Sequence, residues 1–232
     1  VYKRQLIDKG RFLVGLGLML VFLVVLVIIF SPVYNGVTGL DFLDDTYNSI
    51  SKGSAYYIPL VRDRCADAAG TRVAVTLQME SEEQAQQVAL LLENAGSVEI
   101  EEQGQLQFEG SIGSLLGIST DDSDLMYSND VESVTAKYGY DGRRALLNWW
   151  VTLHEIERDL KRQRLFEEAE LTAFVTKKAV EPAYNYLGIE AQHISEKIWI
   201  VVLSLVFYVI YTVWYGFAFM YMFEGLGLKL GH

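Results

Sequence analysis

The sequence predicts an α+β protein with two transmembrane helices that flank an extracytoplasmic domain. Two uncharged apolar segments lie near the ends of the 232-residue chain, at residues 12–30 and 198–223. Between them lies a strongly charged stretch with both strand-like and helix-like periodicity. The composition reflects this division, because 51% of the residues are hydrophobic while 21% carry a formal charge. Such averages fit neither an ordinary globular domain nor a polytopic membrane protein.

The two apolar segments are each long enough to cross a bilayer. Residues 12–30 contain no charged side chain, and nineteen helical residues reach about 28 Å, close to the hydrocarbon thickness. Residues 198–223 are also uncharged and leave room for tilt. We expect the first segment to be a retained anchor rather than a signal peptide, because its apolar stretch is too long and no small-residue cleavage site follows.

The charge distribution predicts the orientation. Residues 1–11, the predicted cytoplasmic N-terminus, carry a net charge of +3, whereas residues 31–196 contain 13 basic and 28 acidic residues, a net charge of −15. The positive-inside rule therefore places both termini in the cytoplasm and residues 31–196 outside, in the periplasm of a cell with an inner membrane. Residues 224–232 form a short cytoplasmic tail under this prediction. The net charge of −11 also argues against nucleic-acid binding.

Residues 31–70 and 71–136 form the first two predicted parts of the extracytoplasmic domain. Residues 31–70 are expected to hold a short amphipathic helix around residues 40–50 and a second one after Pro59. Residues 71–136 read as an acidic α+β unit: a strand at 71–79, a helix opening at 80–83, and a hairpin of 97–101 with 105–109. An acidic loop is expected after a short helix near residues 112–118.

Residues 137–197 form the predicted long helical region. Its apolar positions keep helical spacing, but the stripe changes phase at residues 161–164, which indicates a kink or a continuous helix with a rotating face. A continuous helix of 45 residues would reach about 67 Å. The small α+β unit could not cover it, so we expect a partner there. The residues expected to pack against that partner are Trp149, Leu153, Ile156 and Leu160.

The second apolar segment is rich in aromatic residues. Interfacial tryptophan and tyrosine are ordinary near membrane surfaces, but those deeper in the bilayer need partners for their polar atoms. Packing against another membrane protein is the favoured interpretation, with lipid contact or a pigment or quinone as alternatives. The residues predicted to pack against a partner are Tyr208, Tyr211, Trp214 and Tyr215.

The sequence offers few candidates for chemistry. Asp121, Asp122 and Asp124 are weak candidates for a cation site, since the stretch lacks the glycine and the fifth-position oxygen of a calcium loop. His154 is predicted to be a surface residue, and the single Cys65 excludes an internal disulfide. Neither apolar segment contains Asp, Glu, Lys, Arg or His, so we expect no cofactor and no proton path in this chain.

These features predict a non-catalytic accessory or scaffold subunit of a larger membrane complex, for example a bioenergetic one. The predicted partners are other integral membrane subunits and the lipid bilayer, with no nucleic acid and no enzymatic activity. The alternative is an extracytoplasmic sensor or a module that binds a ligand or cation and signals through a partner protein.

Overall fold

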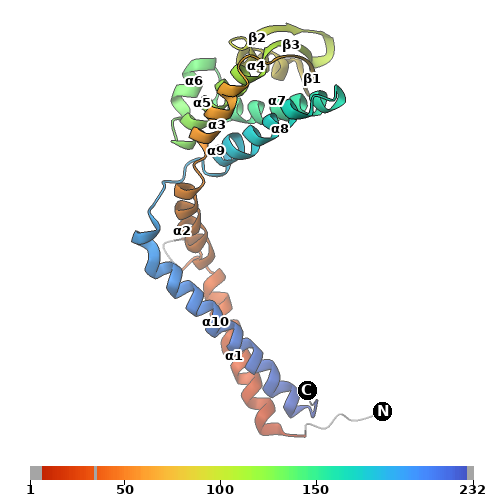
Figure 1. Ribbon diagram of the computed structural model, residues 1–232. Coiled ribbons are helices and arrows are strands. Elements are labelled where there is room, and N and C mark those ends of the chain that lie inside the picture. The colour runs from red at the N-terminus through yellow and green to blue at the C-terminus, as the bar shows by residue number, and fades with distance from the viewer. Residues whose placement is uncertain (1–6, 34–35, 229–232) are drawn as a thin grey trace, which may run out of the picture. The chain divides into compact units, whose positions relative to one another are not determined.

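The computed structural model describes residues 7–33 and 36–228, which form two compact units (Figure 1). One unit combines residues 1–50 with 192–232, within those described limits, and the other is the central domain, residues 51–191. The first unit contains α1 (Lys9–Phe30) and α10 (Ile194–Gly225), and both helices are long and apolar enough to cross a membrane. α2 (Gly39–Ser54) follows α1 and leads into the central domain.

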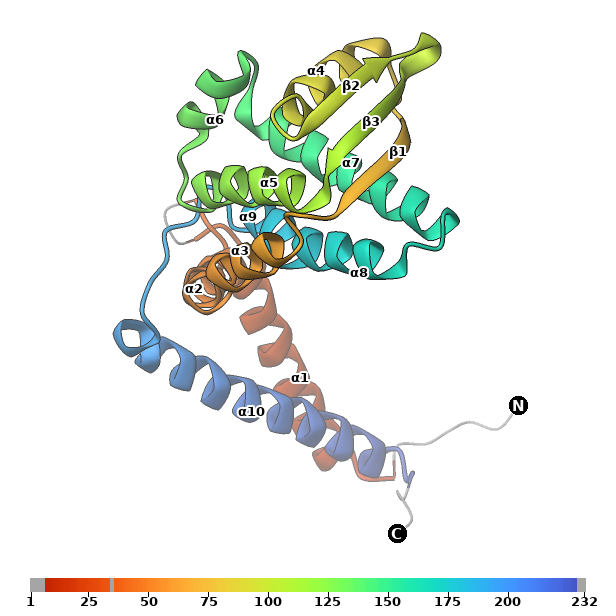
Figure 2. The same cartoon turned by 45° about the horizontal axis from the view of Figure 1, so that its top comes forward.

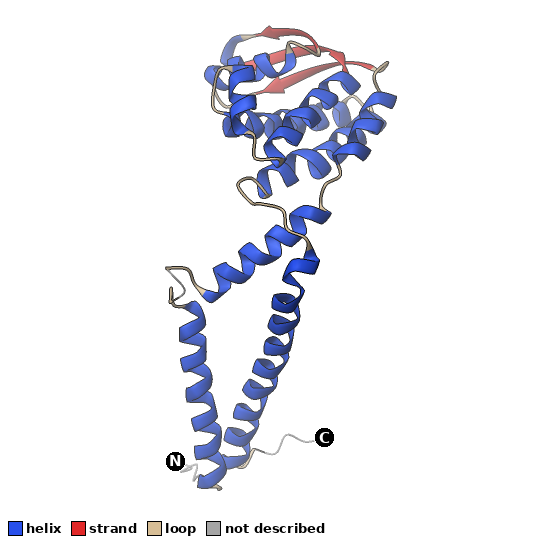
Figure 3. Cartoon of the chain, turned by 90° about the vertical axis from the view of Figure 1, so that its left-hand side faces the viewer, coloured by secondary structure: helices blue, strands red, loops and turns tan. Residues whose placement is uncertain are grey.

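Helices α1 and α10 pack as an antiparallel pair. They meet at the ends that carry the termini and diverge toward their other ends (Figure 3). Arg11 Nη1 lies 2.7 Å from Glu224 Oε2, and a Cβ atom on Gly15 would lie 2.6 Å from the backbone nitrogen of Met222. Glycine therefore allows the two backbones to approach closely at this position, as small residues commonly do between membrane helices. Gly17, by contrast, has nothing within 4 Å of its Cβ position.

The central domain contains a three-stranded antiparallel sheet with one helix-covered face. The strands are β1 (Arg72–Gln78), β2 (Gly96–Ile100) and β3 (Gln105–Ser111), in the spatial order β1-β3-β2. Between β1 and β2 lies α4 (Glu82–Leu92), whose N-cap Ser81 accepts a hydrogen bond from the Gln84 backbone. The predicted order of strand, helix, strand and strand is confirmed, and the hairpin turns at Gln103 and Gly104.

The outer strands of the sheet, β1 and β2, each have one edge that pairs with no other strand, and these two edges are protected in different ways. On β1, the Thr76 N–H donates to Asp159 Oδ2 at 3.0 Å, and Gln163 Nε2 donates to the Ala74 carbonyl at 2.7 Å. Side chains at the end of α7 (Gly142–Arg162) thus occupy backbone groups that a fourth strand would otherwise use. The β2 edge is short and carries the exposed side chain of Glu99.

The remaining helices complete the central domain around the buried face of the sheet (Figure 2). They are α3 (Ile58–Asp67), α5 (Ile112–Tyr127), α6 (Val131–Tyr138), α8 (Phe166–Val175) and α9 (Glu181–Asn185). A π-helical turn, Thr176–Val180, connects α8 to α9. Buried residues from α3 through α9 belong to one hydrophobic core, which residues 71–136 share with the helices that follow them.

The predicted long helical region is a folded-back pair of helices. α7 ends at Arg162, Arg164 adopts a left-handed conformation with φ of 65°, and α8 starts at Phe166. The phase change at 161–164 therefore marks a turn, and α8 packs back against α7 (Figure 2). A straight helix of about 67 Å does not form.

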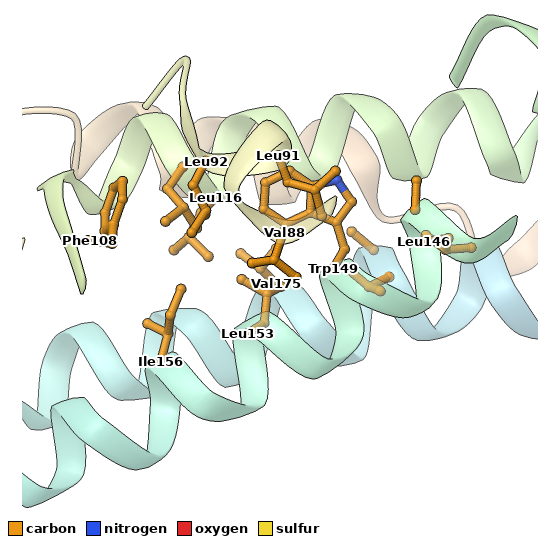
Figure 4. Close-up of a cluster of buried hydrophobic side chains, with 14 of the residues drawn as sticks. Val88, Leu91, Leu92, Phe108, Leu116, Leu146, Trp149, Leu153, Ile156 and Val175 are labelled. Carbon is orange, nitrogen blue, oxygen red and sulfur yellow. The ribbon is translucent and has the colours of Figure 1, made fainter. Parts of the chain in front are cut away.

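The apolar face of α7 is covered by this chain itself. Trp149 is fully buried among residues of α4, α5 and α8, and Figure 4 shows it beside Val88 and Leu91. The four residues that we expected to contact a partner are all 0% exposed and lie in the core: Trp149, Leu153, Ile156 and Leu160. They are not available to a partner in this fold. The reason is that the turn at Gln163 and Arg164 supplies a neighbouring helix that the sequence pattern alone did not locate.

Candidate functional site

The first notable group is a buried ammonium where the chain enters and leaves the central domain. Lys52, near the end of α2, is only 3% exposed. Its Nζ donates hydrogen bonds to the carbonyls of Ile189 at 2.6 Å and Tyr186 at 3.1 Å, and to Asn129 Oδ1 at 3.4 Å. Burial lowers the pKa of Lys52, and the charge of nearby Glu190 opposes that effect. Three oxygen acceptors compensate the ammonium for its loss of water.

Two further side chains complete this group, which we call the Lys52 clasp: Lys52, Tyr127, Asn129 and residues 186–189. The hydroxyl of Tyr127 donates to the backbone carbonyl of Lys52. Asn129 accepts from the Gly188 N–H at 2.7 Å and donates to the Ile189 carbonyl at 3.1 Å. Asn129 adopts φ of 65°, a left-handed conformation that asparagine tolerates better than most residues. Burial raises the pKa of Tyr127 to about 12, so its hydroxyl remains a donor at neutral pH.

A hollow of about 380 Å³ lies beside the clasp. Its lining includes Lys52, Tyr56, Tyr127, Asn129 and Glu190, so it combines two aromatic rings with an ammonium, an amide and an exposed carboxylate. The Lys52 ammonium also lies 5.1 Å from the centre of the Tyr127 ring. A ligand in this hollow would contact the groups that tie the two chain connections together.

The three aspartates considered for a cation site do not act as a group. They lie on α5 rather than in the predicted acidic loop. Asp121 and Asp124 bind Arg62, with Nη2 to oxygen distances of 2.8 and 2.9 Å, and Asp124 also accepts from Tyr56. Within the described residues, no cluster of three or more histidine, cysteine, aspartate or glutamate side chains could hold a metal ion.

Asp122 is a fully buried carboxylate with three donors. It is 1% exposed, and its oxygens accept from Lys137 Nζ at 2.6 Å, from Trp149 Nε1 at 2.7 Å and from the Tyr138 hydroxyl. Burial, followed by the bond to Asp122, raises the pKa of Tyr138. A buried charge that is paired and hydrogen-bonded in this way holds α5, α6 and α7 together. Sequence reasoning placed Asp122 in solvent and so missed this role.

Cys65 and His154 also carry side chains of a reactive type, but both occupy structural positions in the central domain. Cys65 on α3 is buried, its Sγ lies 3.9 Å from Thr120 Oγ1, and burial raises the pKa of the thiol to about 11. A thiol with such a pKa is almost entirely protonated at neutral pH and is a poor nucleophile. The Nδ1 atom of His154 lies 2.8 Å from the carbonyl oxygen of Trp150, and the two rings are tilted by 44° with their centres 4.1 Å apart. His154 is half-buried, whereas the sequence predicted a surface residue.

A second hollow, of about 570 Å³, lies on another face of the central domain. It is lined by Arg143, Arg144 and Leu147 of α7 and by Tyr184 and Leu187 from α9 and the residues after it. Arg144 Nε donates to Gln87 Oε1 at 3.4 Å. We call this feature the arginine hollow. No spacing in the sequence connects the two arginines with Tyr184 and Leu187, which the fold brings beside them.

The aromatic residues of α10 have different surroundings. Tyr211 and Tyr215 pack on Phe22 of α1, with ring centres 4.2 and 5.2 Å apart. Tyr208 is 66% exposed, and Trp214 has a buried Nε1 with no hydrogen-bond partner. Of the four residues predicted to contact a partner, Tyr211 and Tyr215 therefore serve the pairing of α1 with α10. Tyr208 points away from that pairing.

The signals for the clasp in the sequence are weak. Lys52 is one basic residue in an acidic stretch, and neither Tyr127 nor Asn129 belongs to a recognisable motif. Its three parts, residue 52, residues 127–129 and residues 186–189, are more than 50 residues apart in the sequence, so only the fold brings them together. Comparison of the chain with protein-family models, with curated proteins and with solved structures finds no match.

Proposed function

We propose that the chain is a non-catalytic accessory or scaffold subunit of a larger membrane protein complex. The observation that carries this proposal is the Lys52 clasp. It ties residue 52 to residues 186–189, so the two connections toward the apolar helices leave the central domain at one point. Such a point of attachment suits a domain that is mounted on a membrane anchor and displayed to other proteins.

The use of charged groups within the central domain supports a structural role. The carboxylate of Asp122 accepts hydrogen bonds from Lys137, Tyr138 and Trp149, and Asp121 and Asp124 form ion pairs with Arg62. Catalytic acids and bases need a substrate-accessible position and a pKa suited to proton transfer. These groups instead hold helices together, which is what a scaffold requires.

The charge distribution supports the proposed placement in the membrane. Both apolar helices would cross the inner membrane, with the basic residues 1–11 and the tail from Glu224 in the cytoplasm and residues 31–196 outside. The partners would be other integral membrane subunits. Protease digestion of spheroplasts and of inverted vesicles tests this placement, because the central domain should be cut only in the spheroplasts.

The alternative function is a sensor or ligand-binding module outside the cell that signals through a partner. The hollow beside the Lys52 clasp favours it, because a ligand there would contact Lys52, Tyr127 and Asn129 directly. This function predicts that small cations or polar ligands raise the melting temperature of the protein. It also predicts that Lys52→Met abolishes the shift while the matched exposed change, Lys177→Met, preserves it.

The decisive experiment for the favoured function is native mass spectrometry after extraction in a mild detergent. We expect the chain in a stoichiometric complex with at least one other integral membrane protein. Tyr208→Ala should weaken that complex without affecting the pairing of α1 with α10, because the Tyr208 side chain is 66% exposed. A monodisperse lone chain in several detergents, recovered from its native membrane, would refute the proposal.

A further inference from the structure

The arginine hollow combines two cationic side chains with an apolar lining. Its volume of about 570 Å³ is within the range of sites that enclose a small ligand or an anchoring side chain. Arg143 and Arg144 are exposed at its rim, and Leu147 and Leu187 are half-buried in its lining. The hollow thus offers guanidinium groups for an anion and an apolar floor for a hydrophobic group.

The two arginines lack acidic partners within the described part of the chain. Arg62, Arg72, Arg158 and Arg162 each have a carboxylate within 4 Å, but the ion pairs of the described residues include neither Arg143 nor Arg144. In a domain with more acidic than basic residues, a pair of adjacent guanidiniums without an ion pair is unexpected. Their forked donors suit carboxylates on another molecule.

The surroundings of the arginine hollow have the composition of a protein interface. Tyr184 is 57% exposed, and Trp150, one and two helical turns further along α7 from Leu147 and Arg143, is 39% exposed. Tryptophan, tyrosine and arginine dominate the binding energy of protein interfaces. Trp150 Nε1 also donates to Glu181 Oε1 at 3.4 Å, which orients the indole toward α9.

We infer that the arginine hollow is the docking site for an acidic segment of a partner protein. The segment would place carboxylates against Arg143 and Arg144 and an apolar side chain against Leu147, Tyr184 and Leu187. This inference rests on the proposed function, because it names the surface through which the scaffold holds its partner.

Charge makes this docking site selective. Residues 73–136 contain thirteen acidic residues and no lysine or arginine, so an acidic segment is repelled by that part of the domain. The arginine hollow is the complementary patch. Like-charge repulsion elsewhere, together with attraction here, fixes both the position and the orientation of the segment.

The first test combines charge reversal with affinity measurement on the full chain and its copurified partner. Arg143→Glu with Arg144→Glu should weaken the complex by about tenfold or more, because a carboxylate then replaces each guanidinium and repels the acidic groups of the partner. The control is Arg72→Glu with Lys177→Glu, which changes the net charge equally at exposed positions outside the hollow. It should leave the affinity within about twofold. Circular dichroism and melting temperature confirm that each variant folds.

The second test identifies the occupant. Tyr184→p-benzoylphenylalanine places a photoreactive group at the hollow, and Leu90→p-benzoylphenylalanine places one on an exposed position of α4. Illumination of native membranes should link position 184, and not position 90, to a partner peptide with two or more acidic residues beside an apolar one. Lysine substitution of those acids should restore binding to the Arg143→Glu and Arg144→Glu variant.

The possible results separate this inference from the proposed function. If the wild type has a stoichiometric partner but charge reversal leaves its affinity unchanged, the inference is wrong and the scaffold function stands. An adduct with lipid, with a second copy of this chain or with a non-acidic peptide overturns the inference in the same way, as does the absence of any adduct at position 184. If the wild type has no partner at all, both fall.

Discussion

The central domain and the paired helices α1 and α10 are held together by different kinds of interaction. In the central domain, the buried carboxylate of Asp122 has three donors and the buried ammonium of Lys52 has three acceptors. Between α1 and α10, the buried N–H of Trp214 has no partner. Within their apolar segments, the two helices are held by close backbone approach at Gly15 and by aromatic stacking on Phe22, and the Arg11–Glu224 ion pair lies at the end of the pair.

This difference indicates which region depends on its surroundings. A fully hydrogen-bonded network favours one arrangement strongly, because every alternative leaves a charge unpaired in a medium of low dielectric constant. A pair of helices held mainly by apolar contacts can adjust when lipid or another helix packs beside it. We therefore expect the central domain to keep its structure without partners, and the helix pair to respond to its environment.

The largest predicted effect is at Asp122. Asp122→Ala leaves Lys137, Tyr138 and Trp149 without their shared acceptor and should lower the free energy of unfolding by about 3–5 kcal/mol. Asp121→Ala, at a more exposed carboxylate on the same helix, should cost less than about 1 kcal/mol. Urea unfolding of the full chain in detergent measures both. Equal losses would show that the buried network is not the source of rigidity.

The helix pair is tested at its closest approach. Gly15→Leu forces a side chain against the backbone of α10 and should destabilise the pairing by about 1–3 kcal/mol. Gly17→Leu is the matched control, because its Cβ position is free of neighbours. Hydrogen exchange along α10 in detergent reports the effect. Faster exchange in the Gly17→Leu variant as well would mean that helix sequence, and not backbone proximity, governs the pairing.

The Lys52 clasp should have an intermediate effect. Lys52→Met fills the same space but leaves the carbonyls of Tyr186 and Ile189 without their donor, which should cost about 1–3 kcal/mol. Amide exchange at residues 186–189 should accelerate before the rest of the domain is affected. The exposed Lys177→Met serves as the control. If the exchange rate at residues 186–189 did not change, the Lys52 clasp would not be what holds this connection to the domain.

Cys65 provides a test through pH. The pKa of its thiol rises from 9.0 to about 11 on folding. Between these two pH values the thiol stays protonated in the folded state, whereas it loses its proton in the unfolded state. Stability is therefore greatest below pH 9 and falls as the pH rises toward 11, by about 1–2 kcal/mol. Tyr127 shifts in the same direction, so the measurement is the difference between wild type and Cys65→Ala. A difference that does not change with pH would contradict burial of the thiol.

The smallest predicted effects have the opposite sign. Trp214→Phe removes a buried donor that has no partner, and Thr152→Val does the same for an unpartnered hydroxyl in the central domain. Each should be neutral or raise the free energy of unfolding by up to about 1 kcal/mol. Thermal unfolding in one detergent compares them. A clear loss of stability in the Trp214→Phe variant would mean that lipid or water binds the indole N–H. The helix pair would then satisfy its buried polar groups much as the central domain does.

Much of the fold was predictable because local patterns determine it. The apolar segments, the helix after Pro59 and the alternation of Val73, Val75 and Leu77 depend only on neighbours in the chain, and the structure confirms the corresponding elements. The fold-back at Gln163 and Arg164 was not resolved, because a phase change in an apolar stripe does not specify an angle. The error at Trp149, Leu153, Ile156 and Leu160 followed from this uncertainty.

The candidate sites were less predictable. The clasp joins Lys52, Tyr127, Asn129 and residues 186–189, and no spacing in the sequence connects them. Asp122 lies between two aspartates that face Arg62, and the run of acids alone does not reveal which one turns inward. Burial of a charge depends on donors from α6 and α7, and these are set by tertiary packing.

The side chains at the end of α7 that bind the edge of β1 also bear on resistance to aggregation. An unpaired strand edge is a template on which other chains can polymerise. Asp159 and Gln163 occupy backbone groups along the edge of β1, and the opposite edge strand, β2, is five residues long and carries Glu99. The sheet of the central domain therefore offers little edge on which a fibril could nucleate, and we expect the domain to be lost to proteases rather than to β-sheet aggregation.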